Sequence, residues 1–203
     1  MITSPAFAGK KYAVLGLARS GLATVDALVA SGAEILAWDN REEARDAVVG
    51  KARIGDLLTA DLSGYSGIVV SPGVPLNRHP IAGKARDSGV PIIGDIELFA
   101  LARKSLPRHK VVGITGTNGK STTTALVCHI ARTAGLPATM AGNIGYPILS
   151  QEPLPEDGVF LSREGAADDH LIFNVDRPAS ASTRLMIQKR MTTVGSDQPS
   201  CSK

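Results

Sequence analysis

The chain has 203 residues, which is enough for two small domains that each bury a hydrophobic core. Aromatic residues make up only 4% of the sequence and the formal net charge is +3, so the sequence offers no stacking platform for single-stranded nucleic acid, and nucleic acid is not an expected partner. Two cysteines, no apolar run of membrane-spanning length and no leader-like start predict a cytoplasmic protein with no membrane partner, which we expect to be a monomer.

The first hundred residues alternate between strand and helix patterns. Short apolar runs that end in glycine, aspartate or serine are interrupted by a stretch of helical period over residues 22–31, which Gly32 is placed to end. This alternation is typical of an α/β fold, and we predict a Rossmann-like domain with a parallel sheet. The expected strands cover residues 12–16, 34–39, 67–71 and 90–94, and a helix is expected over 95–104.

A glycine-containing turn follows the first expected strand. Gly16 and Gly21 lie at its two ends. Asp39 ends the second strand, and its separation along the sequence from the turn is about that of the acidic residue that binds the ribose of a dinucleotide. Ala18 replaces the middle glycine, where the backbone must come closest to a pyrophosphate, and this disfavours a nicotinamide cofactor. The alternative is a turn that serves only tight strand-to-helix packing, and the agreement in position between this turn and Asp39 favours ligand binding.

The turns that come after the expected strands at 12–16, 34–39 and 67–71 are predicted to lie at one edge of this sheet. In a parallel sheet the carboxyl ends of the strands meet at the same edge, which is where open α/β sheets bind ligands. Together the turns would hold one nucleotide-like substrate. The predicted substrate-binding residues in them are Leu17, Ala18, Arg19, Asp39, Asn40, Arg41, Ser71, Pro72 and Gly73.

A polar, proline-containing interruption at residues 105–109 separates this domain from the rest of the chain. Because proline there favours a helix end, we divide the chain into an N-terminal domain of residues 1–106 and the first part of a P-loop ATPase-type α/β domain at residues 107–161. Residues 162–203 hold short apolar patches without a sustained period, and we expect a disordered tail.

Residues 113–121 form a complete phosphate-binding loop pattern. An apolar run over 110–114 precedes it and an expected helix over 120–134 comes after it, which is the strand-to-helix context that the motif requires. Glycines let backbone N–H groups point at phosphate oxygens, Lys120 supplies a mobile positive charge, and Ser121 would ligate Mg²⁺. The alternative is a glycine-rich turn with a solvated lysine, which the combination of strand, spacing, Lys-Ser pair and helix disfavours. ATP and Mg²⁺ are the expected cofactors, and the predicted nucleotide-binding residues are Gly113, Thr115, Gly116, Thr117, Asn118, Gly119, Lys120, Ser121 and Thr122.

This loop, the Gly-Asn-Ile-Gly run at 142–145, the Ser-Pro-Gly run at 71–73 and the Gly16 turn together resemble the Mur ligase family. The Lys-Ser pair and residues 94–99 resemble the members that add D-glutamate to UDP-N-acetylmuramoyl-L-alanine, and the likeness covers about residues 8–161. It implies a cytoplasmic, ATP-dependent amide-bond synthesis in peptidoglycan precursor assembly, with Lys120 as the catalytic residue. It also implies that Asn143 contacts the UDP-sugar substrate and that Asp39, Asn40 and Arg41 lie on its uridine side.

Beyond residue 161 the resemblance ends. The family's metal-binding glutamate run, its Asn-x-Thr-x-Asp-His segment, its modified lysine and its C-terminal domain have no recognisable counterpart, and Glu164 and residues 169–171 are weighed as chance matches. The break suggests a truncated or frameshifted reading of a longer protein, so we expect no ligase turnover by this chain alone. Other readings stay open: another Mur-type or folylpolyglutamate-type ligase, a non-catalytic nucleotide or UDP-sugar binding module, and, less favoured, a nicotinamide oxidoreductase.

Overall fold

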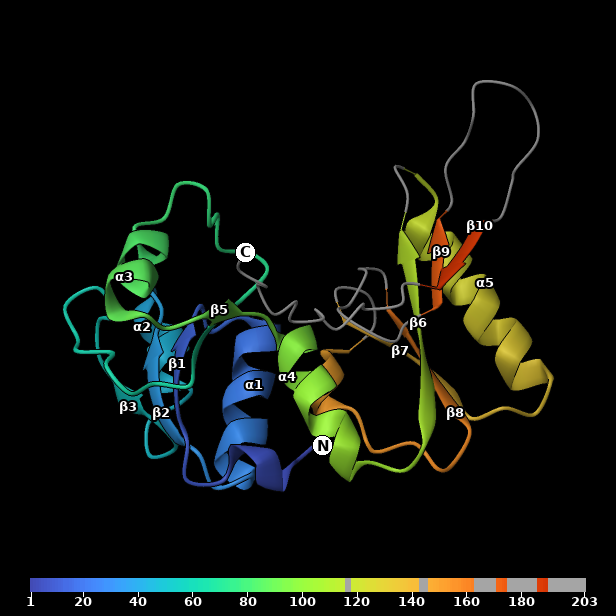
Figure 1. The fold of residues 1–203 in the computed structure, drawn as a ribbon, viewed down its shortest axis with the longest axis horizontal. Coiled ribbons are helices and arrows are strands. Elements are labelled where there is room, and N and C mark those ends of the chain that lie inside the picture. Colours follow the sequence, from blue (N-terminus) through green and yellow to red (C-terminus); the bar gives the residue numbers. More distant parts are fainter. Residues whose placement is uncertain (116–117, 143–145, 163–170, 175–185, 190–203) are drawn as a thin grey trace, which may run out of the picture.

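Two sheets make up the fold, and helices α1 (Arg19–Ala30) and α4 (Asp95–Ala102) lie between them (Figure 1). The computed structural model describes residues 1–115, 118–142, 146–162, 171–174 and 186–189. In that part of the chain, no helix combines the length and the hydropathy needed to cross a membrane.

The first sheet contains five parallel strands in the order β3-β2-β1-β4-β5. The order runs outward from β1 in both directions, so it reverses beside β1, as in dinucleotide-binding α/β folds. This confirms the predicted Rossmann-like parallel sheet. The strands are β1 (Lys11–Leu15), β2 (Glu34–Trp38), β3 (Arg53–Ile54), β4 (Gly67–Val70) and β5 (Ile92–Ile93).

Side chains of β1 alternate between two cores with the two-residue period of a strand. Tyr12 and Val14 enter the large core beneath α1 and α4, whereas Ala13 and Leu15 enter a smaller core on the opposite face. Helix α3 (Ile81–Ser88) covers that second face through Ile81 and Ala85. Because both faces are covered, β1 is apolar at nearly every position instead of alternating with polar residues.

Helix α1 ends at Ala30, and Gly32 stops it from continuing, as the sequence predicts. The glycine adopts a left-handed backbone with φ of 79°. Its N–H donates to the Val29 carbonyl at 2.9 Å, and the N–H of Ala33 donates to the Leu28 carbonyl at 3.0 Å. This pair of bonds is the Schellman arrangement, which satisfies the last carbonyls of a helix and turns the chain back toward β2.

The second sheet has the order β10-β9-β6-β8-β7, and only β10 runs antiparallel to its neighbour. Val112 and Ile114 of β6 pack with Cys128 of helix α5 (Lys120–Thr133), while Val111 faces the other way, into the large core. The elements that the sequence predicts around the phosphate loop are therefore present. The strands are β6 (His109–Thr115), β7 (Ala138–Ala141), β8 (Gly158–Ser162), β9 (Leu171–Asn174) and β10 (Met186–Lys189).

One hydrophobic core joins the two sheets. It contains Val14 and Leu98 from the N-terminal side together with Phe160 from β8 and Leu149 from the short helix η3 (Ile148–Ser150). The N–H of Ile2 donates to the Leu149 carbonyl at 3.0 Å, which ties the start of the chain to the second half. The first sheet uses only residues before 106 and the second only residues after it, yet the shared core means that the domain division stays a prediction.

Several short elements were not expected from the sequence. They include helix α2 (Glu42–Asp46), helix α3 and the two-residue strand β3. Helix α3 carries Gly83 in its interior and buries only Ile81 and Ala85, so its apolar period is too brief to be recognised. The 3₁₀ helices η1 (Pro5–Phe7) and η2 (Arg103–Ser105) are three residues long and leave no periodic pattern at all.

In the segment expected to be a disordered tail, the structure describes two four-residue strands. Strand β9 pairs with β6, and β10 pairs with β9. They coincide with or overlap the two apolar patches at residues 171–173 and 185–187. The rest of residues 163–203 lies outside the described part of the chain, so the expectation of a disordered tail stays a prediction there.

His109 sits where the two halves of the fold meet. Its ring packs against Phe99 of α4, with centroids 5.7 Å apart, and against Phe160 of β8 at 5.1 Å. Its Nδ1 lies 2.7 Å from the Pro107 carbonyl, and its Nε2 accepts from Arg103 Nε at 3.3 Å, an arrangement that the neutral ring satisfies. Burial lowers the pKa of His109 below its usual value, and the nearby Arg103 charge adds to this, against the opposing effect of the Pro107 carbonyl.

We predict that the free energy of unfolding falls as the pH is lowered from about 7.5 to about 5.5, because the unfolded chain takes up a proton at His109 near pH ~6.5 whereas the folded chain resists it. His109→Gln should weaken this pH dependence. Urea unfolding at both pH values measures it, and His129→Gln on the exposed face of α5 is the matched control. Equal pH dependence in the wild type and His109→Gln would contradict the prediction.

Candidate functional site

The candidate site is the edge of the first sheet where three neighbouring strands end. Leu15 of β1 pairs in register with Trp38 of β2 and with Val70 of β4. The turns that come after these three strands therefore begin side by side, beside the point where the strand order reverses. The structure thus brings together the three turns that the sequence predicts for one edge.

The turn from β1 into α1 is unusually tight. Gly16 has a left-handed φ of 87°, and a Cβ at Gly21 would lie 1.9 Å from the Gly16 carbonyl oxygen. No side chain can occupy that space, so glycine at position 21 is required by the close approach of helix to strand. Ala18 is the N-cap of α1 and makes no side-chain capping bond, so the amide groups of the first turn are not capped from this residue.

Asp39 joins the β2 turn to the β1 turn. Its Oδ2 accepts from the Leu17 N–H at 2.7 Å, and its Oδ1 accepts from the Arg41 N–H at 2.9 Å. Arg41 also forms an ion pair with it at 3.3 Å, with side chains 63% exposed for Arg41 and 11% for Asp39. Burial alone would raise the pKa of Asp39, but the hydrogen bonds from Leu17 and Arg41 outweigh it, and the pKa lies below its usual value. The carboxylate is therefore charged and fixed at neutral pH.

Ser71 joins the β4 turn to the β1 turn, on the side of β1 opposite to Asp39. Its hydroxyl donates to the Gly16 carbonyl at 2.6 Å, and its N–H donates to the Leu15 carbonyl at 3.0 Å. Ser71 is buried, with 8% of its surface exposed. Its hydroxyl hydrogen is thus used within the protein, and its oxygen retains the capacity to accept a bond from a ligand.

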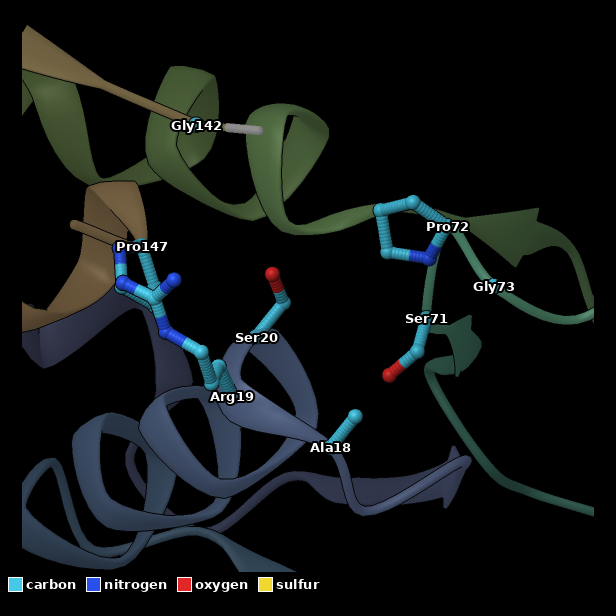
Figure 2. Close-up of a pocket in the computed structure, with 8 residues that line it drawn as sticks. All are labelled: Ala18, Arg19, Ser20, Ser71, Pro72, Gly73, Gly142 and Pro147. Atoms are coloured by element: carbon cyan, nitrogen blue, oxygen red, sulfur yellow. The ribbon is translucent and has the colours of Figure 1, made fainter. Parts of the chain in front are cut away.

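A cavity of about 220 Å³ opens in front of these turns. Figure 2 shows the Ser20 hydroxyl and the Ala18 methyl group turned toward this space, with the Arg19 guanidinium beside Pro147. One wall is formed by the turns of the first sheet, and the other by Gly142 and Pro147 from the second half of the chain. Helix N-terminal amides and hydroxyl groups suit an anionic or hydroxyl-rich ligand. The lining residues are Ala18, Arg19, Ser20, Ser71, Pro72, Gly73, Gly142 and Pro147.

A second cavity, of about 200 Å³, adjoins the first at Gly73. Asp39 and Asn40 form one side of it, and His79 lines it from the loop before α3. The Nδ1 of His79 accepts from the Ile81 N–H at 3.2 Å, so the neutral ring has its remaining N–H at Nε2. The lining residues are Leu15, Gly16, Asp39, Asn40, Gly73, Val74, Pro75 and His79.

Seven of the nine substrate-binding residues predicted in the three turns line these cavities, and the other lining residues are not among them. Ser20 is one of those others, although it lies within the predicted turn of residues 16–21. His79 follows β4 by nine residues, and a lone histidine in a polar loop gives no signal of its own. Gly142 and Pro147 come from the other half of the fold, so only the tertiary structure brings them to the cavity.

The predicted phosphate loop lies between β6 and α5, so its strand-to-helix context is confirmed, whereas phosphate binding stays a prediction. Gly119, with a left-handed φ of 78°, precedes α5, and Ser121 and Thr122 are exposed in its first turn. Gly113 lies within β6, buried and paired with Ser162 of β8, so it belongs to the strand and not to the turn. Thr115 is the last residue of β6, and Asn118 is exposed just before Gly119. Gly116, Thr117 and Asn143 lie outside the described residues.

The metal ligand that the sequence predicts at this loop is the hydroxyl group of Ser121, and not a charged side chain. In the described part of the chain, His, Cys, Asp and Glu side chains form no group of three that would hold a metal ion. The exposed Ser121 hydroxyl fits a Mg²⁺ ion that arrives already bound to nucleotide phosphates, because such an ion takes few ligands from the protein. Lys120 begins the helix beside it.

Comparison with known proteins gives a consistent result. Residues 10–94 match the family described as Mur ligase MurD-like, N-terminal domain. The UDP-N-acetylmuramoylalanine--D-glutamate ligase of Sphingopyxis alaskensis is 70% identical over 162 residues, which are 79% of this chain and 37% of that protein. The protein of the same name from Zymomonas mobilis subsp. mobilis is 54% identical over 189 residues, covering 87% of this chain and 43% of that protein. This chain therefore spans less than half the length of these curated relatives.

Among solved structures, the UDP-N-acetylmuramate:L-alanyl-gamma-D-glutamyl-meso-diaminopimelate ligase from Neisseria meningitides superposes with a TM-score of 0.45. It is 18% identical in sequence, and the match covers 75% of this chain and 52% of that one.

We predict that Gly21→Ala destabilises the protein by about 2 kcal/mol or more, because the added methyl group would overlap the Gly16 carbonyl. Gly83→Ala in α3 is the matched control. A Cβ there meets nothing within 4 Å, so the same substitution should stabilise the helix by about 0.5–1 kcal/mol. Urea unfolding of both variants measures the difference, and equal effects would show that the tight turn is not a constraint.

We further predict that Asp39→Ala lowers the free energy of unfolding by about 1.5–3 kcal/mol at neutral pH, through loss of charge-assisted bonds to Leu17 and Arg41. Because the pKa of Asp39 is lowered by folding, its contribution is present above the carboxyl's unfolded pKa and is lost as the pH falls through its folded pKa. The difference in the free energy of unfolding between the wild type and Asp39→Ala should therefore become smaller at acidic pH. Asp61→Ala, which removes an exposed carboxylate with local bonds to Ser63, should have a smaller effect.

Proposed function

We propose that this chain binds a UDP-linked substrate and ATP. The proposal follows from its homology to part of the Mur ligases that are named for UDP-N-acetylmuramoylalanine and D-glutamate, and these two ligands are the ones that such a reaction would use. The first sheet would hold UDP-N-acetylmuramoyl-L-alanine at its ligand edge. The phosphate loop before α5 would hold ATP with Mg²⁺. The observation that carries the proposal is the set of three strand ends, hydrogen-bonded into one edge with two adjoining cavities.

The shape and charge of the edge support a nucleotide-sugar as its ligand. Each cavity alone is smaller than the ~300 Å³ of a typical ligand pocket, but they meet at Gly73 and so suit a ligand of several parts. The diphosphate would lie against the first turn of α1, where the N–H groups and helix dipole favour an anion. The uridine would lie on the side of Asp39 and Asn40, and the sugar toward Gly142.

The phosphate loop supports a phosphoryl-transfer role. In the proposed reaction a substrate carboxylate oxygen attacks the γ-phosphorus of ATP, and the bond to ADP breaks. The amine of D-glutamate then attacks the acyl phosphate, inorganic phosphate leaves, and the amine loses a proton as the amide forms. Lys120 would neutralise the transferred phosphoryl group, and Ser121 would serve as a ligand of the Mg²⁺. The metal would supply charge neutralisation at those phosphates.

For this chain by itself we expect binding without turnover. The described residues hold no acidic cluster for a further metal ion, and the chain spans only 37% of the length of its Sphingopyxis alaskensis relative. A non-catalytic nucleotide or UDP-sugar binding module is the second candidate, and the two adjoining cavities favour it because they require ligand binding but no turnover. Another Mur-type or folylpolyglutamate-type ligase is the remaining alternative.

Calorimetry and a phosphate-release assay on one sample test the proposal. We expect UDP-N-acetylmuramoyl-L-alanine to bind more tightly than UDP-N-acetylmuramate, a folate not to bind, and ATP with Mg²⁺ to bind separately. Preference for a folate or for UDP-N-acetylmuramate would indicate a different ligase. Phosphate release with ATP, UDP-N-acetylmuramoyl-L-alanine and D-glutamate at the rate of a full-length relative would refute the expectation of binding alone.

An occluding variant locates the UDP-linked ligand. Ala18 is exposed and its methyl group faces the first cavity (Figure 2), so Ala18→Leu should fill the space and weaken binding about tenfold or more without loss of stability. Ala30→Leu places the same side chain at an exposed position at the other end of α1 and should leave affinity unchanged. Unchanged affinity in Ala18→Leu would exclude the proposed site.

A further inference from the structure

Arg45 makes an arrangement that neither the sequence patterns nor the proposed function account for. It lies in the one-turn helix α2, just beyond the end of β2. Its Cζ sits 4.8 Å from the centre of the Trp38 ring, which is a cation–π contact. Its Nη1 donates to the Asp39 carbonyl at 2.8 Å and to the Asn40 carbonyl at 3.1 Å. The side chain therefore folds back over the end of its own preceding strand.

The two carbonyls that Arg45 holds belong to residues that line the second cavity. Asp39 and Asn40 form one side of it. After Trp38 the β-ladder with β1 ends, so the backbone of this turn has lost its strand partner. Arg45 takes the place of that partner by binding two consecutive carbonyls from one nitrogen. The orientation of the Asp39–Asn40 backbone, and with it the wall of the cavity, thus depends on Arg45.

The neighbouring Arg41 acts on the same turn in a different way. It pairs with the Asp39 carboxylate and is largely exposed. Arg45 instead binds the main chain and is partly buried against Trp38. The side chain of Asp39 is therefore held by Leu17 and Arg41, and its main chain by Arg45. The planar guanidinium of an arginine can stack on an aromatic ring and, at the same time, donate hydrogen bonds within its own plane. The ammonium group of a lysine cannot do both.

We infer that Arg45 is a positioning residue, which fixes the Asp39–Asn40 main chain so that the second cavity fits the uridine part of the nucleotide ligand; this rests on the proposed function. Arg45 itself need not touch the ligand. Trp38, which shares its ring face with Arg45, is the only tryptophan in the sequence. Its fluorescence consequently reports on this contact and on ligand binding beside it.

The test uses UDP as the probe and Trp38 fluorescence, with calorimetry as a second readout, on the full chain. We expect wild-type fluorescence to change on UDP binding. Arg45→Met, which keeps an apolar side chain but loses the donor and the charge, should raise the Kd about tenfold. Arg45→Lys should bind nearly as weakly as Arg45→Met, because its charge remains but its planar donor is gone. Lys51→Met is the control, since it removes an equal charge from the surface pair with Asp26.

The outcomes separate the two proposals. If the wild type does not bind UDP by either readout, the proposed function and this inference both fail. If it binds UDP and Arg45→Met binds equally well, only the positioning role is refuted. Full affinity in Arg45→Lys would show that charge alone matters, and this too overturns the inference. Thermal unfolding is measured for every variant. Should Arg45→Met unfold below the assay temperature, Arg45→Lys decides the question.

Discussion

The turn from β1 into α1 is the constraint on which the rest of the candidate site depends. Because a Cβ at Gly21 would lie 1.9 Å from the Gly16 carbonyl, the helix can start immediately against the strand end only if position 21 is glycine. That close start leaves the Gly16 carbonyl and the Leu17 N–H on the sheet edge, where the Ser71 hydroxyl and the Asp39 carboxylate bind them. One turn thereby sets the position of both neighbouring turns.

The polar groups of the edge differ in what they can offer a ligand. Asp39 and Ser71 are largely committed to holding the turns together, since their short bonds run to the main chain of the β1 turn. Ser20, Asn40 and His79 lie around these fixed points and line the cavities. A preorganised frame of this kind lowers the cost of ordering the site when a ligand binds. Asp39 and Ser71, which are easily recognised in the sequence, therefore serve to build the candidate site.

Local patterns predicted the features that depend on neighbours along the chain. The apolar runs of β1, β4 and β6 indicated the parallel sheets, and Gly32 indicated the end of α1. The glycine turn and Asp39 indicated the edge at which the strand ends meet, and ligand binding at this edge stays a prediction. The sequence could not show contacts made by long side chains across several residues, such as Arg45 reaching back to the Asp39 carbonyl. Nor could it show that Gly142 and Pro147 complete a cavity begun by Ala18, because that depends on how the two halves of the fold pack.

That packing links the two proposed binding regions physically. Phe160 of β8 lies in the same core as Val14 of β1, and its ring packs edge-on against Phe99 at a centroid distance of 5.0 Å. Strand β6, which shares this core through Val111, is also the strand that leads into the phosphate loop. A change in the angle between the sheets would expose apolar surface at this core, at a cost of roughly 25 cal/mol for each Å². The shared core therefore fixes the distance between Ala18 and Gly142 on the two walls of the cavity. The same core anchors β6, the strand that precedes the predicted phosphate loop.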